Sequence, residues 1–285
     1  MPSRCWTTLA VFGTLCAASP KRGLVYVPNE AWPQDDAIWI QHNSVLTWYY
    51  TYGREPHAAY NPPASDLEFV PMMWGMGDDP DDTGFLNSIN SQLDAGVNIR
   101  HVLAFNEPDM RWDWGGSDLT PAKAARGYVA NFVPLRSRGI KLGLPSVSGA
   151  GWGIQWLREF EGNCTQLLNR KCEYDFVPVH WYDNFGGFMS HIDEAIAEFP
   201  DARIWVTEYA FAHQNLEATK EFYRLSAEYL DNHPKIDRYG YFGSFRSQVS
   251  NVGPNATFLN NGGLLTNIGS LYLGFGETGL DPISG

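Results

Sequence analysis

Positive charge is scarce in this sequence. Its 285 residues include 20 Lys and Arg against 32 Asp and Glu, which gives a formal net charge of −12. A protein that binds nucleic acid or an anionic membrane surface needs a basic patch to neutralise phosphate groups, and this composition is poor in the residues that build one. We therefore expect neither partner, whereas a neutral substrate is compatible with the charge balance.

Signature motifs of several other chemistries are also missing. No G-x-G-x-x-G follows the first apolar run, so the usual cofactor site of an open doubly wound sheet is absent. The chain has no H-E-x-x-H pair for zinc and no G-x-S-x-G elbow for serine chemistry. In the acidic run at 78–82, Pro80 breaks the ligand spacing of a calcium loop, which favours a solvated loop. We predict no metal and no cofactor.

The hydrophobic run near the N-terminus, residues 9–18, is too short to span a bilayer. Arg4 precedes this run and the small residues 17–19 end it, which is the pattern of a secretory leader. We predict a signal peptide over residues 1–20 and one folded domain over 21–285, and hence a secreted, extracellular protein. A buried N-terminal segment of the folded domain is the alternative.

Cysteine is rare, with four in the chain. Removal of the leader would take Cys5 and Cys16 and leave Cys164 and Cys172, an even pair suited to a disulfide in an oxidising compartment. So short a closed loop would contribute about 2 to 3 kcal/mol. Two free thiols are the alternative, and a metal site is disfavoured because no His or second Cys pair lies nearby. Two N-glycosylation sequons fit the same compartment and begin at Asn163 and Asn255.

Apolar and aromatic residues, in contrast, are plentiful, at 44% and 14% of the chain. Short strand-like apolar runs alternate with helical stretches as far as the C-terminus, which is typical of repeated βα units. Most of these runs are continuously apolar, as expected of parallel strands covered on both faces. The eight runs are residues 22–28, 44–50, 67–74, 98–108, 141–148, 174–182, 203–210 and 238–245.

Helices are predicted between these strands. Residues 120–139 open with Thr120 as N-cap and Pro121 at the first helical position, and they close at Gly139. The other predicted helices cover residues 84–96, 190–200, 215–234 and 264–276. Eight strands, each followed by a helix, in about 250 residues predict a single-domain (β/α)8 barrel of the α/β class. An open doubly wound sheet is the runner-up.

Barrel enzymes carry their working residues at the C-terminal ends of the strands. That rule brings together Glu107, from the fourth strand, and Glu208, from the seventh. Two carboxyl groups that face one another in an aromatic pocket suit glycoside hydrolysis, in which one protonates the leaving oxygen and the other attacks or activates water at the anomeric carbon. The acid must hold its proton near neutral pH, which burial at a hydrophobic strand end and a second carboxylate both favour.

Residues near the two glutamates complete the predicted site. Asn106 can donate its amide to a sugar hydroxyl, and Pro108 ends the strand. Asp109 is expected to hold the turn, and His180 to hydrogen-bond a glutamate or a sugar hydroxyl. Of the aromatic residues, Trp48 could equally belong to the core. The aromatic side chains expected to contact a sugar are Trp48, Trp74, Trp112, Trp114, Trp181, Tyr182, Tyr209, Phe242 and Phe245.

Segments along most of the chain resemble a known family. "FNEPD" and "WVTEYA" look like the acid/base and nucleophile segments of retaining barrel glycosidases. With them, "KRGLVYVP", "WYYTYG", "FVPMMWG", "HWYD" and "NVGPNATFLNNGGLLTNIGSLYLG" resemble glycoside hydrolase family 128, fungal proteins with β-1,3-glucanase activity. The resemblance extends from Lys21 onward and implies Glu107 as acid/base, Glu208 as nucleophile, retention of configuration and a fungal cell-wall or extracellular setting. One departure is "YGYFGSF" at the eighth strand, where many such enzymes carry a Trp under the sugar.

The sequence therefore predicts a secreted, monomeric β-1,3-glucanase that acts on β-1,3-glucan or laminari-oligosaccharides. A retaining enzyme should hold its carboxyl groups about 5 to 5.5 Å apart, because an inverting enzyme needs a wider gap for water. Two alternatives remain open. One is a glucan-binding or oligosaccharide-binding protein on the same barrel with little or no turnover, and the other is a glycosidase with a different β-glucan or mannan preference.

Overall fold

The computed structural model describes residues 20–61 and 65–283. Apart from Pro20, the predicted signal peptide lies outside these ranges. Eight strands are found within them, and each overlaps one of the predicted runs. Their bounds are β1 (Gly23–Val25), β2 (Trp48–Tyr50), β3 (Glu68–Phe69), β4 (His101–Val102), β5 (Lys141–Leu142), β6 (Phe176–Trp181), β7 (Arg203–Tyr209) and β8 (Ile236–Tyr241).

All strand pairs in the described residues are parallel and follow chain order. The pairs form three sheets, ordered β1-β2-β3, β4-β5 and β6-β7-β8. Isolated parallel bridges connect these sheets: Met72 with Leu103, Gly143 with Phe176, and Arg22 with Tyr239. The prediction of parallel strands in sequence order is confirmed, although the hydrogen-bonded ladders are short and divided among three sheets.

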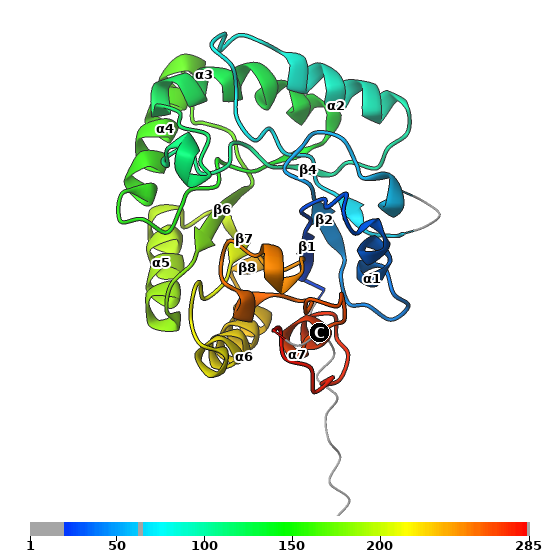
Figure 1. Ribbon diagram of the computed structural model, residues 1–285. Coiled ribbons are helices and arrows are strands. Elements are labelled where there is room, and N and C mark those ends of the chain that lie inside the picture. Colours follow the sequence, from blue (N-terminus) through cyan, green and yellow to red (C-terminus); the bar gives the residue numbers. More distant parts are fainter. Residues whose placement is uncertain (1–19, 62–64, 284–285) are drawn as a thin grey trace, which may run out of the picture.

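Helices lie around the outside of these strands (Figure 1). The helices are α1 (Asp36–Trp39), α2 (Gly84–Asp94), α3 (Pro121–Asn131), α4 (Gly153–Leu168), α5 (Phe185–Glu198), α6 (Leu216–Asn232) and α7 (Asn267–Tyr272). Short 3-10 helices are η1 (Pro33–Asp35), η2 (Ala58–Tyr60), η3 (Trp112–Trp114), η4 (Val133–Arg138), η5 (Ser247–Val249) and η6 (Pro254–Ala256). In the described residues, none of the helices combines the length and the apolar character needed to cross a membrane.

Helix α3 begins as the sequence predicts and ends earlier. The Thr120 side chain accepts a hydrogen bond from the Lys123 backbone N–H at 3.3 Å, and Pro121 occupies the first turn. Pro134 lacks the N–H that would continue the helical ladder, so the α-helix ends at Asn131 and η4 carries the chain to Gly139. The single helix predicted over 120–139 is therefore two helices.

Helix α4 is one that the sequence reading missed. Its buried face contains Ile154, Leu157, Phe160 and Cys164, which recur at helical spacing. Cys164 forms a disulfide with Cys172, as predicted, and so ties the end of α4 to the segment before β6. The sequon residue Asn163 lies on the same helix and donates to the Glu159 carbonyl.

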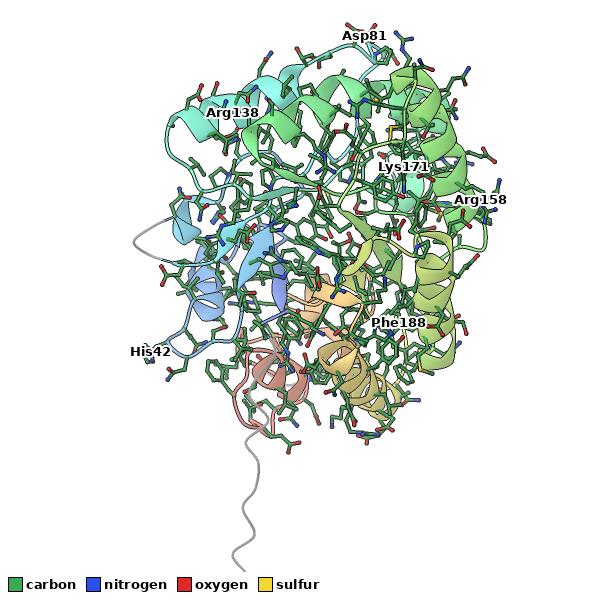
Figure 2. The ribbon with its side chains drawn as sticks, turned by 180° about the vertical axis from the view of Figure 1, so that it is seen from behind. His42, Asp81, Arg138, Arg158, Lys171 and Phe188 are labelled. Carbon is green, nitrogen blue, oxygen red and sulfur yellow. A yellow bond between two sulfur atoms is a disulfide. The ribbon has the colours of Figure 1, made fainter. Side chains whose placement is uncertain are left out.

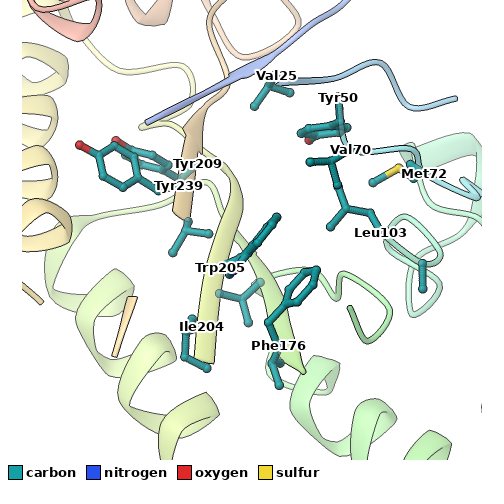
Figure 3. Close-up of a cluster of buried hydrophobic side chains, with 14 of the residues drawn as sticks. Val25, Tyr50, Val70, Met72, Leu103, Phe176, Ile204, Trp205, Tyr209 and Tyr239 are labelled. Carbon is teal, nitrogen blue, oxygen red and sulfur yellow. The ribbon is translucent and has the colours of Figure 1, made fainter. Parts of the chain in front are cut away.

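Buried hydrophobic side chains fill the space between the strands, and Phe176 and Trp205 lie near the N-terminal ends of theirs (Figure 3). Trp205 stacks on Phe176 with ring centroids 3.9 Å apart. Trp48, the first residue of β2, packs against Trp205 and donates its indole N–H to the Lys21 carbonyl. Because Trp48 is fully buried at this end, the prediction that it contacts a sugar is wrong, and it is a core residue.

Charged side chains occupy the periphery of the helical layer. Asp81 and Arg158 extend at the edge of the molecule (Figure 2). Asp81 accepts a hydrogen bond from Arg126, and Arg158 donates to Glu198 across neighbouring helices. Such exposed pairs contribute little to stability, so the fold depends chiefly on the buried apolar and aromatic residues.

Candidate active site

Glu107 and Glu208 come together at the C-terminal ends of the strands. Glu107 follows β4 and is held by a 2.7 Å hydrogen bond from its backbone N–H to the Ser146 carbonyl, whereas Glu208 belongs to β7. One side-chain atom from each of Glu107, His180 and Glu208 lies within 4.8 Å of the others. Two acids from distant parts of the chain thus share one site.

His180 lies between the two carboxylates. Its Nδ1 is 2.9 Å from a carboxylate oxygen of Glu107 and 3.5 Å from one of Glu208. Its Nε2 is 3.0 Å from the Thr207 hydroxyl. With both ring nitrogens engaged and the ring fully buried, His180 contacts the glutamates rather than a ligand. The spacing of these three side chains would also allow them to ligate a metal ion.

Three phenols surround Glu208. Tyr182 donates to one carboxylate oxygen at 2.5 Å, and Tyr52 donates to the other at 2.7 Å. The Tyr50 hydroxyl lies 3.3 Å from that second oxygen but nearer the Thr207 carbonyl, at 3.1 Å. Tyr50 and Tyr52 were missed in the sequence reading, although both lie where the second predicted strand ends, which is the position that the barrel rule selects. Donors of this kind favour the ionised carboxylate.

Burial and charge act in opposite directions on these groups. Burial raises the pKa of Glu208; the charge of His180 opposes this rise, and the charge of Glu107 adds to it. Burial alone would lower the pKa of His180, but the charges of Glu208 and Glu107 raise it. Burial and the charge of Glu208 keep the pKa of Tyr50 and Tyr182 well above 10, so both phenols remain donors.

The two glutamates differ in burial. The side chain of Glu208 is 7% exposed and that of Glu107 is 13% exposed. Burial raises the pKa of Glu208, the deeper of the two carboxyl groups. Glu107 is therefore the more accessible of the two carboxyl groups.

Glu107 is held by an unusual turn. Its φ is +38°, in the left-handed region that residues other than glycine seldom adopt. Asp109 accepts hydrogen bonds from the backbone N–H of Ser148 at 3.0 Å and from its hydroxyl at 2.5 Å, which ties this turn to the segment after β5. Asp109 therefore holds the turn, as expected.

A cavity of about 620 Å³ opens over the two carboxylates. Six of the predicted sugar-contacting residues line it. They are Trp74, Asn106, Trp114, Trp181, Tyr182 and Phe242. The Nδ2 of Asn106 donates to the Gly115 carbonyl, and its buried Oδ1 has no partner among the described residues. Oδ1 can thus accept a hydrogen bond, and the amide nitrogen keeps a second N–H that can still donate, so the expected donation to a sugar hydroxyl stays a prediction.

Three predicted contacts lie elsewhere. Tyr209 is fully buried and stacks on Phe188, and Figure 3 shows it beside Tyr239. Side chains alternate along a strand, so Tyr209 points away from the site because its neighbour Glu208 points into it. Phe245 packs against Phe242 and lines a separate small cavity. Trp112 is 72% exposed and does not line the cavity over the glutamates.

Residues 23–272 match the model of a protein family described as glycosyl hydrolase catalytic core. A curated relative, alkali-sensitive linkage protein 1 of Schizosaccharomyces pombe, is 28% identical over 90% of this chain and 45% of its own length. The chain thus spans less than half of that relative.

Solved structures extend the similarity. One is a family 128, subgroup III, curdlan-specific exo-β-1,3-glucanase from Blastomyces gilchristii in complex with glucose. It is 28% identical, with a TM-score of 0.69 over 90% of this chain and 98% of that one. Another is a family 128, subgroup VII, oligosaccharide-binding protein from Cryptococcus neoformans. It is 21% identical and has a TM-score of 0.67, and the match covers 92% of this chain and 96% of that one. At this identity the similarity is one of fold.

Proposed function

Because the chain belongs to the glycosyl hydrolase catalytic core family and to glycoside hydrolase family 128, we propose that it hydrolyses β-1,3-glucan by a retaining mechanism. The observation that carries the proposal is the meeting of Glu107 and Glu208 beneath one aromatic cavity. Substrates would be β-1,3-glucan and laminari-oligosaccharides, which are neutral and carry apolar C–H faces for Trp74, Trp114 and Trp181.

In this proposal Glu208 is the nucleophile. The phenol donors Tyr182 and Tyr52 favour the anion and hold both carboxylate oxygens in place, and the nearby His180 adds positive charge. Glu208 attacks the anomeric carbon, and a covalent glycosyl-enzyme forms as the leaving oxygen departs. Water then attacks the same carbon and releases Glu208, with net retention of configuration.

Glu107 is the proposed acid and base. In the first step it gives its proton to the leaving oxygen, and in the second it takes a proton from the attacking water. The bond between its Oε1 and His180 Nδ1 orients the carboxyl group, and the turn at Glu107 fixes its approach. The acceptor oxygen of Asn106 would receive a sugar hydroxyl beside the reacting carbon.

We also propose that the eight strands close into a (β/α)8 barrel. The bridge between Arg22 and Tyr239 supports closure, because it joins the segment before the first strand, β1, to the last strand, β8. We further propose a secreted, monomeric glycoprotein in a fungal cell-wall or extracellular setting, with a signal peptide over 1–20 and a catalytic domain over 21–285. The disulfide supports an oxidising compartment. Asn163 and Asn255 are the proposed glycosylation sites.

A glucan-binding protein with little turnover is the second candidate. The observation in its favour is that Phe242, rather than a Trp, follows β8 and lines the cavity. Phe242 packs edge-on against Tyr182, with ring centroids 5.8 Å apart, and is only 8% exposed, so it offers a smaller stacking surface. The oligosaccharide-binding neighbour shares the fold.

One experiment separates the two candidates. Reducing-end release from laminarin is followed over time, and the anomeric configuration of the first product is read by proton NMR. The hydrolase predicts steady release and a β-configured first product. Binding of laminari-oligosaccharides without release would support the second candidate, and an α-configured first product would overturn the retaining mechanism.

A further inference from the structure

Two glycines lie against opposite edges of the Trp181 ring, which lines the cavity over the glutamates. A Cβ added to Gly187 would lie 2.4 Å from Cζ2 of the indole. A Cβ added to Gly149 would lie 2.7 Å from Cε3, the opposite carbon of the same six-membered ring. Carbon atoms pack at about 3.5 to 4.0 Å, so a side chain at either position would displace the indole.

Neither glycine is explained by its backbone. Both have φ outside the left-handed region that favours glycine. Gly187 lies in the first turn of α5, where alanine would favour the helix, and Gly149 belongs to the segment between β5 and α4. What the two positions share is the space that they leave for the indole of Trp181.

Two further contacts fix the same ring. Its Nε1–H donates to the Asn184 carbonyl at 2.9 Å, and the Asn184 side chain accepts from the Gly187 N–H at 2.9 Å. The ring of His191, also on α5, lies 5.4 Å from the indole between centroids, at an interplanar angle of 30°. Trp181 is therefore confined at both edges, at its nitrogen and against a second ring, and these contacts together define one orientation in the cavity wall.

We propose that Gly149 and Gly187 are positioning residues that orient Trp181 for the binding of glucan. The inference rests on the proposed function, in which the indole offers its face to a glucosyl unit. Stacking on a sugar depends on the plane of the ring, so displacement of the indole weakens binding. The hydrogen bonds that hold Glu107 and Glu208 come from other side chains, and the chemical step is therefore unaffected.

Alanine in place of Gly187 tests the inference, and α5 supplies a matched control. Gly187→Ala places a methyl group against the indole. Gly186→Ala lies in the same turn of α5, but its added Cβ would meet only the Asn184 Oδ1 within 4 Å, at 3.4 Å. Affinity for a laminari-oligosaccharide of defined length is measured by calorimetry in a Glu208→Gln background, and kcat and KM are measured in the active enzyme.

The expected result is a loss of binding alone. Gly187→Ala weakens the affinity and raises KM about tenfold, while kcat changes by less than about twofold. Gly149→Ala, which presses on the opposite edge, gives the same pattern, and Gly186→Ala matches the wild type. In a Trp181→Phe background, which removes the far part of the indole, Gly187→Ala produces no further loss, because the group that it displaces is gone.

Three results would overturn the inference and leave the proposed function intact, provided that the wild type hydrolyses laminarin. They are equal affinities of Gly187→Ala and Gly186→Ala, a fall in kcat with KM unchanged, and additive losses when Gly187→Ala is combined with Trp181→Phe. A wild type that neither hydrolyses laminarin nor binds the oligosaccharide would refute the proposed function, and the inference with it.

Discussion

The two ends of the strand bundle each hold a buried carboxylate beside a histidine, yet their surroundings differ. At the N-terminal end, Glu68 lies 2.6 Å from His101 and 2.6 Å from Arg238. At the C-terminal end, His180 lies between Glu107 and Glu208, and no Lys or Arg among the described residues forms an ion pair with either glutamate. One end therefore has an additional fixed positive charge and the other has an additional carboxylate.

The surrounding side chains reinforce that difference. The guanidinium of Arg238 lies 4.5 Å from the ring centre of Trp205 and 5.6 Å from that of Trp48. Burial would raise the pKa of Glu68, but its hydrogen bonds to His101 and Arg238 lower it. In contrast, the pKa of Glu208 is raised. At the N-terminal end, His101 and Arg238 balance the charge of Glu68. At the C-terminal end, two carboxylates share one histidine, so the negative charge of Glu107 and Glu208 is not fully balanced.

The largest expected effect is on catalysis at the C-terminal end. Glu208→Gln removes the proposed nucleophile and should lower kcat on laminarin by about a thousandfold or more. Stability should be kept, because the amide has the shape of the carboxyl group: its oxygen accepts from one phenol, and its NH2 group donates to the oxygen of the other. Initial rates of reducing-end release and urea unfolding of the same preparation measure both. A variant that retained wild-type turnover would contradict the assignment of Glu208.

At the opposite end the effect should fall on stability. Glu68→Gln leaves Arg238 buried without a counter-charge, so the free energy of unfolding should drop by about 3 kcal/mol. The kcat per folded molecule should stay unchanged. Urea unfolding measures the stability, and initial rates divided by the concentration of folded protein measure kcat. The exposed Glu30→Gln serves as control. Loss of kcat without loss of stability would mean that the two ends are not separate in role.

The pH dependence of stability should have opposite signs at the two ends. The folded-state pKa of Glu68 is lowered below 4.5, so its stabilisation is present above pH 4.5 and is lost as pH falls through that lower value. The folded-state pKa of Glu208 is raised above 4.5, so its contribution is complete below pH 4.5 and is lost as pH rises through the raised value.

Unfolding free energies of the wild type, Glu68→Gln and Glu208→Gln, measured from about pH 3 to about pH 7, test these signs. The difference between the wild type and Glu68→Gln should shrink at the acidic end. Glu208→Gln should gain relative to the wild type as pH rises. The proposed nucleophile must be ionised to attack. The same raised pKa therefore predicts that, as the pH is lowered, kcat/KM of the wild type begins to fall at a pH that is still above 4.5. Parallel pH profiles for the two variants would contradict the comparison.

The smallest effect is expected from the residue that positions His180. Thr207→Val removes the hydroxyl 3.0 Å from Nε2 and leaves that nitrogen without its buried partner. We expect kcat to fall about tenfold with KM unchanged, because His180 then holds Glu107 less precisely. Thr207→Ser should restore most of the rate. A change in KM alone, or no recovery with serine, would argue against a positioning role.

Much of this arrangement could be predicted. Continuous apolar runs gave eight parallel strands, and the rule that strand ends carry the working residues brought Glu107 and Glu208 together. The same rule would have selected Tyr50 and Tyr52, had it been applied to the second strand. Tyr209 was misassigned because alternation along the strand was not applied to the residue next to Glu208.

Other features could not be predicted from the sequence. Trp48 belongs to the core because the partners that bury it, Trp205 and Arg238, are distant in sequence. The left-handed backbone of Glu107 depends on contacts with the segment after β5.

The sequence by itself determined the order of the strands, the disulfide and the pair of acids, because periodicity, turn residues and residue type are local properties. Only the tertiary structure decided which carboxyl group lies deeper, which phenols surround it and which tryptophans face the cavity. Those outcomes depend on distances and on exclusion of water, and both arise only when distant segments pack together.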